Sequence, residues 1–214
     1  PDSLRMDHLP YAICDEVDAF PWDVGGEGDP MTLIENRQRT FSRAKTFLVS
    51  TPTVADESRI QQSYARSNQC RYHVPCPHCG TLQTIDLDRI KYSTEHQPDG
   101  AEEGSKRVVD AWFVCCDCGA EIREGEKTAM LAGGRWIAER PEITHHHGYH
   151  LNALYAPIGL GLTWKRVMQK WVEVQKDTAE LKAFVNTYLG QVWRETGEGA
   201  DAASVLARVE HYTR

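Results

Sequence analysis

The sequence has no run of the roughly 18 apolar residues that a membrane-spanning helix needs. It also lacks a secretion signal, in which a charged N-terminal segment precedes a short apolar one. Positive charge is in deficit, because 24 Lys and Arg face 31 Asp and Glu and leave a net charge of −7. This balance provides no overall attraction for nucleic acid, although a local basic patch would still bind DNA. The chain begins at Pro1 rather than at a methionine, and we therefore expect a fragment of a longer protein.

Four of the seven cysteines form two C-x2-C-G turns, Cys76 with Cys79 and Cys115 with Cys118. Each turn presents two thiolates to one ion, and the pair supplies the four tetrahedral ligands that Zn²⁺ prefers. The sequence therefore predicts a structural zinc ribbon in a reducing cytoplasm, with one enlarged excursion between the turns and Cys116 as a bystander. The alternative is two disulfides or four unrelated thiols, which the missing secretion signal disfavours.

A short apolar run at residues 11–14 is followed by two adjacent acids, Asp15 and Glu16. Such runs are typical of buried parallel strands, and acids that follow them lie at the carboxyl end, where α/β sheets bind ligands. The pattern favours a Walker B element, in which Asp15 holds Mg²⁺ through water and Glu16 orients or deprotonates the attacking water. The alternative is a strand that runs into an acidic surface turn.

A second buried strand is predicted at residues 45–50, after a helix that begins at Asp29-Pro30. Two strands joined by a helix form a βαβ unit, and their carboxyl ends face one crevice. The second strand ends in Ser50-Thr51-Pro52-Thr53. We expect the hydroxyl groups of Ser50, Thr51 and Thr53 to sense a γ-phosphate and to couple hydrolysis to movement.

In the rest of the chain, the spacing of apolar residues predicts further strands and helices, and one segment is rich in histidine. Consecutive histidines at 145–147, together with His150, suggest a second metal site, but neighbours on an extended chain point to opposite faces and no cysteine or carboxylate joins them. We expect a polar surface there instead, or a strand that faces DNA or a partner. The other expected elements are a helix at 55–66, strands at 70–74, 82–92, 108–114 and 136–138, a short helix at 124–131, a segment at 148–156 that returns to the main sheet, and helices after Thr163 and Asp177.

An ordered set of motifs carries a family resemblance. The motifs are Cys14-Asp15-Glu16, Ser50-Thr51-Pro52-Thr53, His73-Val74-Pro75-Cys76-Pro77-His78-Cys79-Gly80 and Phe184-Val185-Asn186-Thr187-x-Leu189-Gly190-x-x-Trp193. Together they resemble the large terminase subunit of tailed bacteriophages, in its GpA-like branch. The resemblance implies a P-loop ATPase that uses ATP and Mg²⁺ to drive double-stranded DNA into a procapsid, joined to an endonuclease. It assigns Asp15 to Mg²⁺, Glu16 to catalysis and the segment from Ser50 to Thr53 to coupling.

The same resemblance implies partners and a location. The partners are the small terminase subunit, the portal of the procapsid and further copies of the chain assembled on that portal, all in the cytoplasm of the host. The family's phosphate-binding loop lies upstream of Walker B, and no G-x4-G-K-[ST] occurs in this chain. The metal-binding aspartates of the nuclease lie downstream. We therefore expect the isolated chain neither to hydrolyse ATP nor to cut DNA.

We expect an α/β fold: a partial P-loop (ASCE/RecA-like) ATPase core, from which a β-rich four-cysteine zinc ribbon projects as an insertion, with helices at the C-terminal end. Two alternatives remain: a superfamily-2 helicase fragment, because Asp15-Glu16-Val17-Asp18 resembles a DExD box, and an independent zinc-ribbon module that binds nucleic acid. The predicted division is residues 1–67 for the second half of the ATPase core, 68–122 for the ribbon, 123–194 for the remaining, mostly helical ATPase part and 195–214 for a linker toward the nuclease.

Overall fold

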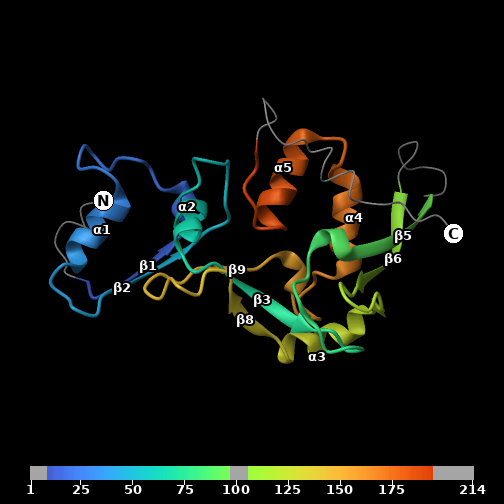
Figure 1. The fold of residues 1–214 in the computed structure, drawn as a ribbon. Coiled ribbons are helices and arrows are strands. Elements are labelled where there is room, and N and C mark those ends of the chain that lie inside the picture. Colours follow the sequence, from blue (N-terminus) through green and yellow to red (C-terminus); the bar gives the residue numbers. More distant parts are fainter. Residues whose placement is uncertain (1–8, 97–105, 195–214) are drawn as a thin grey trace.

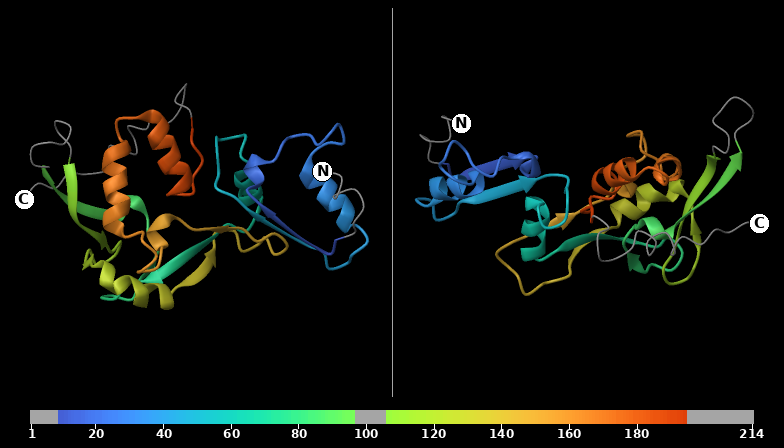
Figure 2. Two further views of the ribbon diagram at one scale, coloured as in Figure 1. Left: turned by 180° about the vertical axis from the view of Figure 1, so that it is seen from behind. Right: turned by 90° about the horizontal axis from the view of Figure 1, so that it is seen from above.

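The computed structural model describes residues 9–96 and 106–194, which form two lobes that lie side by side (Figures 1 and 2). The smaller lobe contains residues 9–67, and the larger lobe contains the described residues from 68 onward. Each lobe has its own cluster of buried apolar side chains. No helix in the described part of the chain is long and apolar enough to cross a membrane.

The smaller lobe is a βαβ unit followed by a further helix. Strands β1 (Tyr11–Asp15) and β2 (Lys45–Val49) pair in parallel, and helix α1 (Pro30–Gln38) lies between them in the chain. The carboxylate of Asp29 caps α1 by accepting hydrogen bonds from two backbone N–H groups of its first turn. Helix α2 (Arg59–Arg66) follows β2, and a single 3-10 turn, η2 (Val17–Ala19), follows β1. The structure thus confirms the βαβ unit expected from the sequence.

Only one face of the β1–β2 sheet is covered by the described residues. On that face Cys14 packs with Val17 and with Ile34 of α1. The opposite face is apolar but open, and Ile13 is 81% exposed. The other exposed apolar side chains of this face are Tyr11, Phe47 and Val49. The expected sheet of a few parallel strands flanked by helices is therefore reduced to two strands with one covered face.

In the larger lobe, β3 (Cys70–Pro75) is the central strand of the first sheet. It pairs antiparallel with β4 (Leu82–Gln83) and β8 (Arg135–Ala138), and in parallel with β9 (Tyr149–His150). The prediction that residues 148–156 return to the main sheet is therefore wrong, because their only strand pairs with β3. Apolar composition predicts that this segment is buried but not which strand it joins, and here the N–H of Cys70 donates to the carbonyl oxygen of Gly148 beside β9.

The second sheet is antiparallel and has the order β5-β6-β7. Its strands are β5 (Ile90–His96), β6 (Lys106–Val114) and β7 (Glu121–Ile122). The strand expected at residues 82–92 is thus divided between two sheets. A short break with the 3-10 turn η3 (Leu87–Arg89) separates the two parts and redirects the chain.

Three helices complete the larger lobe. They are α3 (Lys127–Ala132), preceded by the 3-10 turn η4 (Glu124–Glu126), then α4 (Trp164–Val174) and α5 (Thr178–Thr187). A 3-10 turn, η5 (Ala153–Tyr155), lies between β9 and α4. The side chains of Thr163 and Asp177 cap α4 and α5 as the sequence predicts, because each accepts hydrogen bonds from backbone N–H groups of the first turn.

The cysteine turns and the last helices share one core. Cys76 and Cys115 are each 2% exposed and belong to the same cluster as the buried faces of α4 and α5. The expectation that the ribbon projects from a core completed by these helices is therefore wrong: the helices pack on the ribbon strands, and the β1–β2 sheet forms the separate, smaller lobe (Figure 1). The other buried members of the shared cluster are Val74, Ile85, Ile90, Val108, Ala111, Phe113, Ile122, Met130, Leu154, Tyr155, Trp164, Val167, Met168, Trp171, Val174, Phe184 and Leu189.

Candidate functional site

The carboxyl ends of β1 and β2 bring the predicted acidic and hydroxyl residues together. Asp15 lies opposite Val49 in the strand register, so Glu16 and Ser50 follow at the same edge of the sheet. The hydroxyl oxygen of Ser50 lies 3.4 Å from Glu16 Oε2 and 3.0 Å from the carbonyl oxygen of Thr51, and its one hydrogen can be donated to either. Residues 34 positions apart in the chain thus meet at one strand edge.

Glu16 has an unusual backbone conformation. Its φ of 53° and ψ of 48° place it in the left-handed region, which costs a residue with a side chain about 1–3 kcal/mol. Its N–H donates to Oδ1 of Asp15 at 3.0 Å. Both side chains are exposed, so each carboxylate is open to a ligand. Strain of this kind is concentrated at functional sites, where surrounding contacts hold it in place.

Asp18 joins the loop after β1 to the segment after β2. One carboxylate oxygen accepts hydrogen bonds from both the backbone N–H and the hydroxyl of Thr53, each at 3.0 Å. The other accepts from the backbone N–H of Ile60, in the first turn of α2, at 2.8 Å. Its own N–H donates to Ser50 Oγ at 3.3 Å. In the sequence, Asp18 stands out only as the last residue of a DExD-like pattern, which does not predict this bridging position. An acidic residue three positions after the end of a strand would have indicated it.

The three predicted hydroxyl residues are not equivalent. The Ser50 side chain faces Glu16, and the Thr53 hydroxyl is occupied by Asp18. Thr51 is exposed at the tip between them. The structure therefore brings Ser50 to the acidic pair and uses Thr53 to hold the loop.

The segment after α5 touches the same loop. The N–H of Trp193 donates to the carbonyl oxygen of Thr53 at 2.9 Å, and the N–H of Ala55 donates to the carbonyl oxygen of Trp193 at 2.8 Å. Val54 and Trp193 thereby form a parallel β-bridge. The hydroxyl segment is therefore hydrogen-bonded to the end of the larger lobe.

The four predicted cysteines converge on one point. The Sγ atoms of Cys76, Cys79, Cys115 and Cys118 lie within 4.8 Å of one another, and no other group of three or more potential metal ligands occurs among the described residues. Sγ of Cys76 lies 3.9 Å from that of Cys118, and Sγ of Cys79 lies 3.7 Å from that of Cys115. The exposed side chain of Cys116 is not part of the cluster.

The two turns have the same backbone plan. In the first, the N–H of Cys76 donates to the carbonyl of Thr81, and the N–H of His78 donates to Sγ of Cys76 at 3.4 Å. In the second, the N–H of Cys115 donates to the carbonyl of Ala120, and the N–H of Asp117 donates to Sγ of Cys115 at 3.5 Å. The glycine that ends each turn has a φ near +70°, which glycine adopts without strain.

Buried Gln83 supports the second turn. Its Nε2 donates to Sγ of Cys115 at 3.5 Å, and its Oε1 accepts from the N–H of Cys116 at 2.8 Å. The backbone of Ala120 acts to lower the pKa of the Cys118 thiol, but hydrogen bonds with the other three thiols raise it to about 12. Burial acts to raise the pKa of the Cys115 thiol, but hydrogen bonds from the backbone N–H groups of Asp117 and Cys118, and from the thiols of Cys76 and Cys118, lower it to about 6. A lower pKa increases the fraction of thiolate, which is the form that binds a metal.

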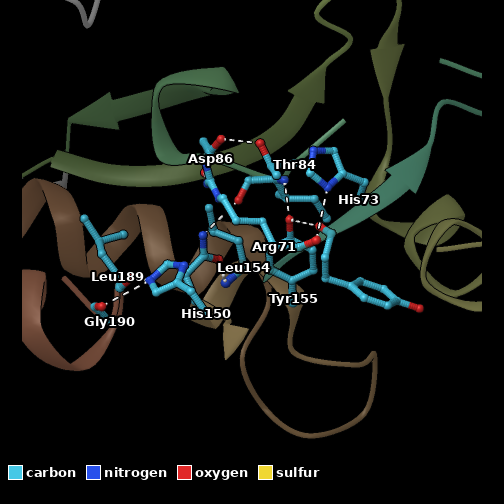
Figure 3. A network of polar contacts seen from close by, with 12 residues as sticks. Arg71, His73, Thr84, Asp86, His150, Leu154, Tyr155, Leu189 and Gly190 are labelled. Carbon is cyan, nitrogen blue, oxygen red and sulfur yellow. Dashed lines mark hydrogen bonds and ion pairs between the residues drawn. The ribbon is translucent and has the colours of Figure 1, made fainter. Parts of the chain in front are cut away.

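The histidines do not form a metal site in the described structure. His146 Nε2 lies 3.2 Å from Ser63 Oγ, and His147 Nδ1 lies 2.9 Å from the side-chain amide of Asn68. His150 Nε2 lies 3.0 Å and 3.1 Å from the carbonyl oxygens of Leu189 and Gly190 (Figure 3). Each ring thus binds a different element, and the rings fasten this segment to α2, to the start of β3 and to the end of α5.

Comparisons with known proteins agree with the motifs. The sequence model of the phage terminase large subunit gpA, ATPase domain, matches residues 1–136, and that of the terminase large subunit gpA, endonuclease domain, matches residues 146–214. The chain is 28% identical to the terminase large subunit of Enterobacteria phage P21, over 94% of the chain and 33% of that protein. It is 29% identical to the terminase large subunit of Escherichia phage lambda, over 99% of the chain and 34% of that protein. The chain thus spans about a third of the length of these relatives, and no solved structure matches it.

The two family matches meet between residues 136 and 146. The division expected from the sequence differs, because it continues the ATPase part to residue 194 and assigns residues 195–214 to a linker. The matches confirm the family resemblance and do not favour the helicase fragment or the independent zinc module.

Proposed function

Because the chain belongs to the family of phage terminase large subunits of the gpA type, we propose that it is part of an ATP-driven motor that packages double-stranded DNA. The full-length protein would carry both the ATPase and the endonuclease. Its further partners would be the small terminase subunit, the portal of the procapsid and other copies of itself, in the cytoplasm of the infected host. The ATPase part of this proposal depends on one observation: β1 and β2 end at the same edge of the sheet, where Ser50 Oγ lies within hydrogen-bonding distance of Glu16.

The residues at the strand ends suit Mg²⁺ and a nucleotide. Mg²⁺ prefers oxygen ligands and retains several waters, and exposed Asp15 offers a carboxylate in the place where a water-mediated contact would form. Mg²⁺, when bound, neutralises charge on the phosphates. The Glu16 carboxylate has lone pairs left over after its single long hydrogen bond from Ser50, so it can orient a water molecule and accept its proton. A change at the γ-phosphate would change the hydrogen bonds of Ser50 and would thereby shift the loop that the hydrogen bonds between Asp18 and Thr53 stabilise.

The cysteine cluster suits zinc in a structural role. A tetrahedral Zn²⁺ with Zn–S distances of about 2.3 Å requires sulfur–sulfur distances of about 3.8 Å. Two of the sulfur pairs lie at 3.7 Å and 3.9 Å, all four sulfur atoms lie within 4.8 Å of one another, and the hydrogen bonds that the turns donate to sulfur favour thiolates. Four protein ligands leave no open position for a substrate, which is typical of a structural zinc site. The zinc would join the ends of β3 and β6 in the larger lobe.

The test uses the full-length protein with Glu16→Gln. Removing a general base lowers turnover by about 10²–10⁴-fold, so DNA-dependent ATP hydrolysis should fall by at least 100-fold while nucleotide binding persists. The matched control is Glu35→Gln, which removes the same charge from an exposed position on α1 and should leave hydrolysis unchanged. Hydrolysis by Glu16→Gln at more than half the unmodified rate would refute the assignment.

A further inference from the structure

A surface cleft of about 330 Å³ lies between the start of β6 and one side of α4, from Lys165 in its first turn to Glu173 in its last. Its lining comes from two elements that are far apart in the sequence and belong to the larger lobe (Figure 1). It is distinct from both the strand ends and the cysteine cluster. The lining residues are Arg107, Val108, Lys165, Arg166, Gln169 and Glu173. We call it the β6–α4 cleft.

The β6–α4 cleft is positively charged. Arg107, Lys165 and Arg166 are all exposed, and within the described residues none of them forms an ion pair. Glu173 is the one acidic residue of the lining, and its carboxylate accepts a hydrogen bond from Gln169. Three cations therefore face one acid on a protein whose net charge is −7. A local excess of positive charge against an acidic background indicates an anionic partner.

The contribution of these cations to folding does not explain their positions. Lys165 and Arg166 occupy the first turn of α4, which carries the positive end of the helix dipole. A cation there is unfavourable, the reverse of the stabilisation that an acid would provide. Glu124, whose carboxylate accepts from the N–H of Trp164 at this helix end, also binds the buried Lys127. Lys165 and Arg166 form no ion pair within the described residues and add positive charge beside the helix end.

We propose that the β6–α4 cleft binds the phosphodiester backbone of double-stranded DNA. This inference rests on the proposed function and adds a DNA-contacting surface to it. Three cationic side chains from two elements suit a row of phosphates, and such contacts position a protein without reading sequence. No aromatic side chain lines the cleft, and single-stranded nucleic acid is usually held by stacking of its bases on aromatic rings. The lining thus favours the duplex backbone over exposed bases.

The test measures binding of the 214-residue chain to a 30-base-pair duplex at several salt concentrations, by fluorescence anisotropy without ATP. Each phosphate contact contributes about 0.9 to the slope of log Kobs against log salt. The double variant Arg107→Gln, Lys165→Gln should therefore lower the slope by about 1.8 and weaken binding at low salt. Arg166 is left intact, because its guanidinium also donates to the carbonyl of Gly161 and holds the loop before α4.

The matched control is the double variant Arg135→Gln, Lys176→Gln, which removes the same two charges from exposed positions outside the cleft. It should keep the original slope. Equal losses in both double variants, or no loss in the cleft variant, would overturn the proposal, and so would binding of inorganic pyrophosphate in place of the duplex. Because ATP is absent, a negative result leaves the Glu16 test of the ATPase untouched, and a negative Glu16 test leaves this result standing.

Discussion

Loss of Cys115, one of the four proposed zinc ligands, should disrupt far more than the cysteine turns. We expect Cys115→Ser to reduce the zinc content from about one ion per chain to a small fraction of that. Structural zinc sites contribute about 10–16 kcal/mol of apparent binding free energy in zinc-finger peptides at pH 7. That range overlaps the upper part of the roughly 5–15 kcal/mol by which a whole domain is stable. Without the metal, the larger lobe should therefore unfold at ordinary temperature.

The damage should reach α4 and α5, because the cysteines share their core. Cys115 belongs to the same buried cluster as Trp164 and Trp171, which are 0% and 2% exposed. Both indole rings should become accessible to water in Cys115→Ser, so tryptophan emission should shift to longer wavelength. Zinc analysis by mass spectrometry, together with fluorescence and thermal unfolding, measures each step separately. Chelation of zinc from the unmodified chain should reproduce the fluorescence change.

The matched control is Cys116→Ser, one position away. Its side chain is exposed and lies outside the cluster, and the hydrogen bond from its backbone N–H to Gln83 Oε1 does not depend on the side chain. Zinc content and emission should stay as in the unmodified chain. Full zinc occupancy in Cys115→Ser would refute the four-cysteine site. Loss of zinc with unchanged tryptophan emission would instead refute the shared core.

Two further predictions concern the loops around the strand ends and the histidines. Asp18→Asn should destabilise the smaller lobe by about 2 kcal/mol, because an amide has one acceptor oxygen and leaves the N–H of either Thr53 or Ile60 unpaired. Urea unfolding measures this loss of stability, and a change below about 0.5 kcal/mol would contradict the bridging role. Burial, followed by the charge of Arg66, lowers the pKa of His146 from 6.5, so the unfolded chain binds more protons and stability should fall as the pH drops below about 6.5. His146→Gln should flatten that dependence, and an unchanged acid limb of the pH–stability curve would count against it.

Features that depend on short sequence patterns were predictable. A spacing of two residues brings both thiols of a cysteine pair to the same side of one tight turn. Cys76 and Cys79 could therefore be predicted as a pair of metal ligands without knowledge of the fold. The parallel pairing of β1 and β2 followed from two apolar strands with a helix between them. The helix starts at Thr163 and Asp177 were equally local, because capping depends on one side chain and the next turn.

Features that depend on distant packing were not predictable. An apolar stripe on α4 shows that one face is buried but not which surface covers it, and the stripe packs on β6 rather than on the β1–β2 sheet. The bridging position of Asp18 depends on where α2 begins relative to β2, which no motif encodes. The division of residues 82–92 between two sheets likewise depends on how the break at η3 redirects the chain.

The β-bridge between Val54 and Trp193 makes the larger lobe a loop with joined ends. The chain leaves the smaller lobe after residue 67 and crosses the whole larger lobe, yet it returns at Trp193 to the segment that follows β2. A pull on the chain beyond residue 194 would therefore act first on the two hydrogen bonds at Thr53 and Ala55, before any strain crossed the core of the larger lobe. Thr53 and Trp193 are 140 positions apart in the sequence, yet they are hydrogen-bonded to each other. A force on Trp193 would therefore act directly on the loop that contains Thr53.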